Sequence, residues 1–151
     1  MTSRRISVFF YGLFMDEELL RAKGAQPTSP RQACVRGFAL RIGQRATLVP
    51  VSDARAYGVL MELSHEEIER LYAEPGVRMY RPEAVVAELA DGAQVPALCF
   101  NLQITPQAGE SNDAYAQKLR GLARRLGLPA DYVGRIGAAV ESLEKGGPVG
   151  E

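Results

Sequence analysis

The segment ISVFFYGLFMDEELLRAKG, residues 6–24, joins a strand signal to a helix signal through one glycine. Residues 6–11 are rich in β-branched and aromatic side chains, which favours a buried strand that ends at Gly12. Asp16 is a good helix N-cap, and the residues that follow run from acidic ones to Lys23 and Gly24, which predicts a short helix. The chain is therefore expected to begin with a buried strand that leads almost directly into a helix.

Further strand signals follow this unit. A turn-rich segment, residues 26–29, precedes the alternating residues 35–42, which predict a second strand. Residues 46–51 and 56–63 predict two more strands, and the latter places Tyr57, Val59, Met61 and Leu63 on one face.

A hairpin is expected next, because residues 85–89 and 95–100 flank the turn dipeptide Asp91-Gly92. Pro96 has no N–H to donate to a sheet, so its strand should lie at an edge or bulge there.

Helix signals follow the fourth strand and return at the end of the chain. Ser64 and Glu67 have the capping-box spacing ahead of a short helix. Residues 115–126 have helical spacing and stop at Gly127, and Pro129 can open a second helix with apolar residues at 133, 136, 140 and 143. Residues 145–151, rich in glycine, are expected to form a flexible tail.

Length, composition and charge limit the classes of protein to which the chain can belong. With 151 residues, 46% of them hydrophobic, the chain fits a single domain over residues 1–151. Eighteen basic residues balance eighteen acidic ones, which disfavours nucleic acid and anionic membranes as partners. The apolar residues 6–14 are too few to span a bilayer, and the N-terminal residues do not have the pattern of a signal peptide. A cytoplasmic protein is therefore expected.

Common catalytic motifs are absent from the sequence, including the P-loop, G-x-S-x-G, H-E-x-x-H and G-x-G-x-x-G. The single histidine, His65, lies within the capping box and is interpreted as an exposed first-turn residue. Cys34 and Cys99 are far apart and have no metal-ligand spacing, so neither a metal site nor a structural disulfide is expected.

Two features could carry chemistry. The turn at Gly12 directs backbone N–H groups toward one spot, which favours an anion, although Tyr11 as a core aromatic and Gly12 as a simple turn explain the same residues. Glu74 precedes Pro75, which holds its backbone extended, and the alternative is an ordinary solvated loop glutamate.

Several segments together point to one known family. They are Phe10-Tyr11-Gly12 before a short helix, residues 46–50 (ATLVP), residues 57–63 (YGVLMEL), residues 71–77 (LYAEPGV) with Met79-Tyr80, and near the C-terminus Tyr115 with residues 127–132 (GLPADY). In their order and spacing, the chain resembles the γ-glutamylcyclotransferase-like (AIG2-like) family over most of its length.

The resemblance implies an α+β fold, a small mixed β-barrel flanked by short helices with two C-terminal helices. It also implies an internal aminolysis, in which a γ-glutamyl amide closes to 5-oxoproline and releases an amine or amino acid, with no cofactor and no metal. Glu74 would be the general acid/base, with Tyr80 as its hydrogen-bonding partner, and a small γ-glutamyl substrate would be held by the loop Tyr11, Gly12, Leu13, Phe14 and Met15.

The chain departs from the family pattern inside that loop. The family's glycine is usually followed by a small hydroxyl residue and then asparagine, whereas this chain has Leu13 and Phe14. The backbone N–H donors of the loop are kept, but the side-chain donors of the family pattern are lost. This change is consistent both with an altered substrate and with a loss of activity.

Two other readings remain beside the enzyme. One is a non-catalytic relative that binds a small anionic metabolite in the same cavity. The other is an acyl-transfer enzyme with Cys34 or Cys99 as nucleophile and His65 as base, which their strand patterns disfavour. The leaving amine is not specified by the sequence, and a homodimer stays open.

Overall fold

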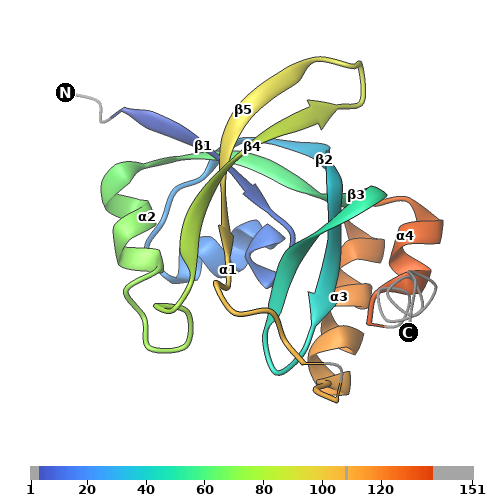
Figure 1. Ribbon diagram of the computed structural model, residues 1–151. Coiled ribbons are helices and arrows are strands. Elements are labelled where there is room, and N and C mark those ends of the chain that lie inside the picture. Colours follow the sequence, from blue (N-terminus) through green and yellow to red (C-terminus); the bar gives the residue numbers. More distant parts are fainter. Residues whose placement is uncertain (1–3, 108, 138–151) are drawn as a thin grey trace.

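Five strands close into a barrel in the order β1-β3-β2-β4-β5 (Figure 1). The computed structural model describes residues 4–107 and 109–137. Neighbouring strands pair antiparallel except β1 and β5, which pair parallel at Val8 and Leu98, so the barrel is mixed as expected. The strands are β1 (Arg5–Phe10), β2 (Thr28–Ile42), β3 (Ala46–Ser64), β4 (Arg81–Leu89) and β5 (Gln94–Asn101).

Short helices flank the barrel, and two more follow β5. The first group comprises the 3₁₀ turn η1 (Leu13–Met15), α1 (Glu17–Ala22) and α2 (His65–Leu71); the second comprises α3 (Asp113–Arg125) and α4 (Ala130–Arg135). In Figure 1, α3 and α4 lie together at one side of the barrel and α2 lies at the other. Leu119 of α3 and Val133 of α4 belong to the same buried core as the strands. No helix in the described ranges is long and apolar enough to cross a membrane.

The predicted helix ends are confirmed in the structure. Asp16 accepts hydrogen bonds from the amides of Glu18 and Leu19 and so caps α1. Ser64 and Glu67 form the reciprocal capping box at the start of α2. Gly127, which follows α3, has a φ of +80°, a conformation that glycine adopts without strain.

The prediction of separate strands at residues 46–51 and 56–63 was wrong, because both belong to β3. The polar residues between them interrupt the apolar pattern, yet they form a bulged bend at which the pairing register with β2 shifts between Arg36 and Phe38. Gly37 on β2 and Asp53 on β3 have positive φ there. The start of the second strand at residue 35 was also wrong, because β2 already begins at Thr28 and includes part of the turn-rich segment.

The C-terminal helix is shorter in the described residues than its apolar spacing predicted. α4 ends at Arg135, after which Ile136 is extended and Gly137 has a φ of +87°. Ile136 is nevertheless buried, as its spacing indicated. Residues 140 and 143 and the tail at 145–151 lie outside the described residues.

The first strand runs through the centre of the core. Val8, Phe9 and Phe10 are almost fully buried, and β3 packs so closely beside them that a Cβ on Gly58 would lie 2.1 Å from the carbonyl oxygen of Phe10. Glycine at position 58 therefore sets how near β3 can approach β1. That strand leads into residues 11–15, which we call the Gly12 loop.

We expect Gly58→Ala to lower the free energy of unfolding by about 2–3 kcal/mol, because the added methyl group meets backbone that cannot rotate away. Urea denaturation of both proteins measures the change. Gly121→Ala is the matched control: its Cβ would enter open space on α3, so it should stabilise the protein by up to ~1 kcal/mol. Equal effects of the two substitutions would contradict the close approach.

Candidate functional site

A cavity of about 250 Å³ opens where three separate segments of the chain meet. Residues 9–14 supply one wall, residues 44–46 supply a second, and the segment after α2 supplies a third through Tyr72, Gly76, Val77 and Tyr80. The loop after the first strand and the loop after the second helix thus border the same space.

Aromatic rings hold the first and third of these segments to each other and to β5. The ring of Tyr72 lies on that of Phe100 with centroids 4.0 Å apart and 14° between the planes. Phe14 meets Tyr72 edge to face at 5.7 Å. Such contacts stabilise by about 0.5–1.5 kcal/mol each beyond the area they bury, so the junction is a fixed part of the structure.

Gly12 occupies the position where the Gly12 loop passes nearest to α3. A Cβ on Gly12 would lie 2.6 Å from the hydroxyl oxygen of Tyr115. Burial raises the pKa of Tyr115 to about 12, against a smaller opposing effect of a hydrogen bond from the Leu13 backbone. The phenol therefore stays protonated at neutral pH.

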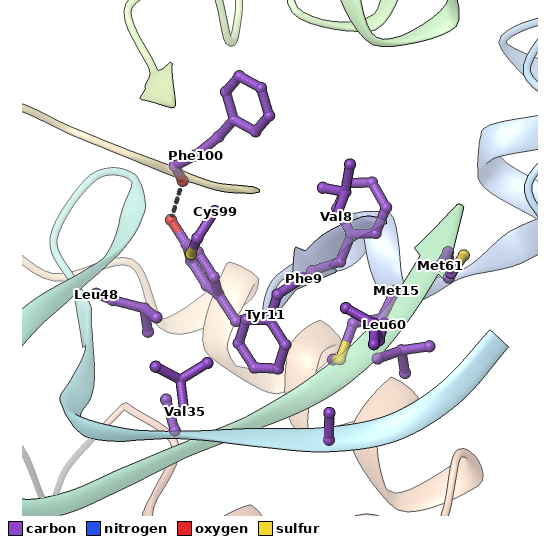
Figure 2. Close-up of a cluster of buried hydrophobic side chains, with 14 of the residues drawn as sticks. Val8, Phe9, Tyr11, Met15, Val35, Leu48, Leu60, Met61, Cys99 and Phe100 are labelled. Atoms are coloured by element: carbon purple, nitrogen blue, oxygen red, sulfur yellow. Dashed lines mark hydrogen bonds between the residues drawn. The ribbon is translucent and has the colours of Figure 1, made fainter. Parts of the chain in front are cut away.

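Met15 does not belong to the cavity wall, contrary to the sequence expectation. Its amide donates to the Gly12 carbonyl at 3.0 Å in the 3₁₀ turn, and its side chain is 1% exposed within the core. Figure 2 shows Met15 among the buried side chains near Leu60. Since the turn occupies the Met15 amide and Tyr115 engages that of Leu13, the amides of Gly12 and Phe14 are the ones for which no described residue is an acceptor.

Tyr11 is both a core residue and a lining residue. Its hydroxyl donates to the carbonyl oxygen of Phe100 at 2.6 Å, the dashed line in Figure 2, and burial raises its pKa well above the usual range. This bond ties the end of the first strand to β5, so Tyr11 shapes the cavity as a neutral group.

Glu74 lies beside the cavity and not in its wall. Its carboxylate oxygen Oε1 is 2.8 Å from Nζ of Lys23, and the side chain is 42% exposed. The carboxylate is thus partly exposed, and Glu74 is not among the residues that line the cavity. Its chain neighbours Tyr72 and Gly76 do line the cavity, which puts Glu74 at the rim.

Tyr80 lines the cavity, but the hydrogen-bond partner of its hydroxyl is a backbone carbonyl and not Glu74. The hydroxyl donates to the carbonyl oxygen of Ala46, at the start of β3. Burial raises the pKa of Tyr80 and of Tyr72, so these phenols also remain neutral.

Arg45 was missed by the sequence reasoning. It lies in the turn between β2 and β3, lines the cavity, and donates from Nε to the Gly76 carbonyl at 3.1 Å. In the sequence it follows another polar residue, Gln44, in a short turn between two strand signals, and nothing local relates it to residue 76.

The cysteine reading is contradicted by the structure. Cys99 is fully buried, and burial together with Glu83 raises its pKa to about 12; burial and Glu88 also raise the pKa of Cys34. His65 is exposed at the start of α2 and lies 3.3 Å from Glu69, so the histidine expected as the base pairs with a carboxylate and not with either thiol. Within residues 4–107 and 109–137, no three His, Cys, Asp or Glu side chains gather as metal ligands.

The profile of the family described as "Gamma-glutamyl cyclotransferase, AIG2-like" matches residues 8–118. The chain belongs to the γ-glutamyl cyclotransferase, AIG2-like family. The matched range includes the Gly12 loop, Arg45, Glu74 and the first half-dozen residues of α3, Asp113 to Lys118. No curated protein matches the chain.

Solved structures of similar proteins share the fold of this family member. A protein named "Gamma-glutamyl cyclotransferase" superimposes with a TM-score of 0.74 at 19% identity, covering 88% of this chain and 86% of that one. An uncharacterised protein from Homo sapiens gives 0.73 at 20% identity, covering 87% and 86%. An AIG2-like protein from Mus musculus gives 0.55 at 14% identity, covering 83% and 85%. At these identities the likeness establishes the fold.

Gly12→Ala should destabilise this family member because its methyl group meets the Tyr115 hydroxyl, and Tyr115→Phe should relieve that contact. In a double-mutant cycle of unfolding free energies, the pair is expected to couple by about 1 kcal/mol or more. Independent, additive effects of the two substitutions would contradict the assigned contact.

Proposed function

We propose that this protein is a γ-glutamyl cyclotransferase-type enzyme and that Glu74 is its general acid/base. The proposal is supported by membership of the family and by the single cavity to which the Gly12 loop and the loop after α2 both contribute. The Phe14–Tyr72 ring contact between these loops is the observation that carries it.

The reaction needs one proton carrier and no other reagent. The α-amine of the glutamyl unit attacks its own γ-carbonyl carbon, a ring C–N bond forms, and the original amide C–N bond breaks. The proton lost by the attacking nitrogen is gained by the leaving nitrogen, so one carboxylate can carry out both transfers. Because the nucleophile and the electrophile belong to one substrate molecule, the site has mainly to hold the glutamyl unit in a folded conformation.

Neutral donors surround the space where this ring would close. The amides of Gly12 and Phe14 are suited to the substrate's α-carboxylate, and the hydroxyls of Tyr72 and Tyr115 stay protonated at neutral pH. Such donors can stabilise a developing oxyanion without taking its proton.

The ion pair with Lys23 is compatible with a catalytic Glu74. Both side chains are partly exposed, at 29% and 42%, and exposed pairs of this kind contribute only about 0–1 kcal/mol. A substrate ammonium group can therefore replace Lys23 as the partner of the carboxylate at little cost. We infer that Glu74 turns from Lys23 toward the substrate amine when the cavity is filled.

A non-catalytic binding protein is the second candidate, and one observation favours it. Among the described residues that line the cavity there is no carboxylate, and Leu13 and Phe14 supply no side-chain donors. In this reading the cavity holds a small anionic metabolite and Glu74 only pairs with Lys23.

Incubation with a panel of γ-glutamyl amino acids and amines, with 5-oxoproline measured, separates the two candidates. Glu74→Gln should lower kcat/KM by a factor of roughly 100 or more, because proton transfer by a positioned group contributes that much. Glu66→Gln, exposed on α2, is the matched control and should leave the rate unchanged. Ligand binding without any 5-oxoproline would favour the binding protein, and full activity of Glu74→Gln would remove Glu74 from the mechanism.

Lys23→Met tests the proposed movement of Glu74. With its competitor gone, the carboxylate should serve the substrate more readily, and kcat/KM should rise by up to about fivefold, the equivalent of a surface pair. Arg21→Met is the control, because Arg21 lies in the last turn of α1, just before Lys23, and pairs with Glu17, and neither residue lines the cavity. A large loss of activity in Lys23→Met would show instead that the pair positions Glu74.

A further inference from the structure

The cavity has one formal charge among the described residues that line it, and this charge is Arg45. The other lining residues are aromatic, aliphatic or uncharged. A cation at the entrance of an otherwise uncharged cavity attracts an anionic group and disfavours a cationic one.

The turn that carries Arg45 is held on two sides. The Gln44 amide donates to Oε1 of Glu110 at 3.3 Å, and Nδ2 of Asn112 donates to the Gln44 carbonyl at 3.1 Å. A Cβ on Gly43 would lie 2.5 Å from Cβ of Pro106, so the segment before α3 packs directly on this turn. The backbone at Arg45 is therefore fixed relative to the cavity.

The side chain is anchored as well. Its Nε donates to the Gly76 carbonyl, whereas the terminal guanidinium nitrogens donate to no described residue. Arg45 also lies near enough to Tyr80 to lower the pKa of that phenol, against the larger effect of burial. The guanidinium is thus held at one end and presents its two terminal nitrogens to a ligand.

We propose that Arg45 binds a carboxylate on the leaving amine, so that the preferred substrates are γ-glutamyl amino acids with apolar side chains and not γ-glutamyl amines. This inference rests on the proposed function. The glutamyl unit must curl inside the cavity to close its ring, which leaves the departing amine toward the exposed rim where Arg45 lies. A guanidinium and a carboxylate form paired charge-assisted hydrogen bonds, and the apolar wall accommodates the rest of the leaving group.

Two ligands that differ by one carboxylate test the proposal. γ-Glutamylphenylalanine and γ-glutamylphenethylamine share the glutamyl unit and the aromatic ring, and only the first has a carboxylate on its leaving amine. For each, kcat/KM is obtained from 5-oxoproline release and the dissociation constant from calorimetry. The proteins are the wild type, Arg45→Gln, Arg45→Lys and the control Arg70→Gln, whose side chain is exposed on α2.

The wild type and Arg70→Gln should favour the acid by roughly tenfold to a hundredfold, the range of a hydrogen bond to a charged group. Arg45→Gln should lose this preference because its kcat/KM and its affinity for γ-glutamylphenylalanine fall. Both quantities should stay unchanged for γ-glutamylphenethylamine. Arg45→Lys should retain part of it, because the charge remains and the paired geometry is lost. Circular dichroism verifies that each variant is folded.

The binding measurements separate this proposal from the reaction. Tighter binding of the acid that depends on Arg45, without turnover of either compound, would support the carboxylate site and argue against the enzyme. Turnover with equal preference for both compounds, or a preference that persists in Arg45→Gln, would overturn the role of Arg45 and leave the reaction standing. Binding of neither compound would also overturn it.

Discussion

The stack of Tyr72 on Phe100, with the edge of Phe14 against it, is the contact on which the site depends. Tyr72 follows α2, Phe100 belongs to β5 and Phe14 belongs to the turn after β1. Three segments that are remote in sequence are brought together by one cluster of rings. Without this cluster the Gly12 loop and the Glu74 loop would have no common wall, and the cavity would not form between them.

The charges are arranged around this apolar junction and not within it. Glu74 and Lys23 pair at the rim, Arg45 is anchored to Gly76, and the phenols of the wall are kept neutral by burial. A charged group is costly to bury without partners, which explains why the interior is left to uncharged donors. A ligand with charges at its ends and a neutral amide in its middle suits such a site.

Local sequence patterns predicted the parts of the fold that depend on local chemistry. Asp16, Ser64 with Glu67, and Gly127 were identified correctly because caps are satisfied by residues a few positions away. The continuity of β3 was missed because it depends on pairing with β2 across the bend at Gly37 and Asp53, and a polar run gives no sign of a partner strand.

The site was predicted in outline through the resemblance to a family and less well in its details. The pairing of the Gly12 loop with the Glu74 loop could be expected, but the ion pair of Glu74 with Lys23 and the bond from Tyr80 to Ala46 join residues more than thirty positions apart. Arg45 and Met15 were misjudged for the same reason. Which side of a short turn faces a cavity is decided by what packs on it, and that information is not local.

A crystal structure of the protein with 5-oxoproline would test the central claim most directly. We expect the lactam ring in the cavity between the Gly12 loop and Tyr72, its carboxylate on the amides of Gly12 and Phe14, and the Glu74 carboxylate turned away from Lys23 toward the ring nitrogen. A ring bound elsewhere, or a filled cavity with Glu74 still paired to Lys23, would contradict the account.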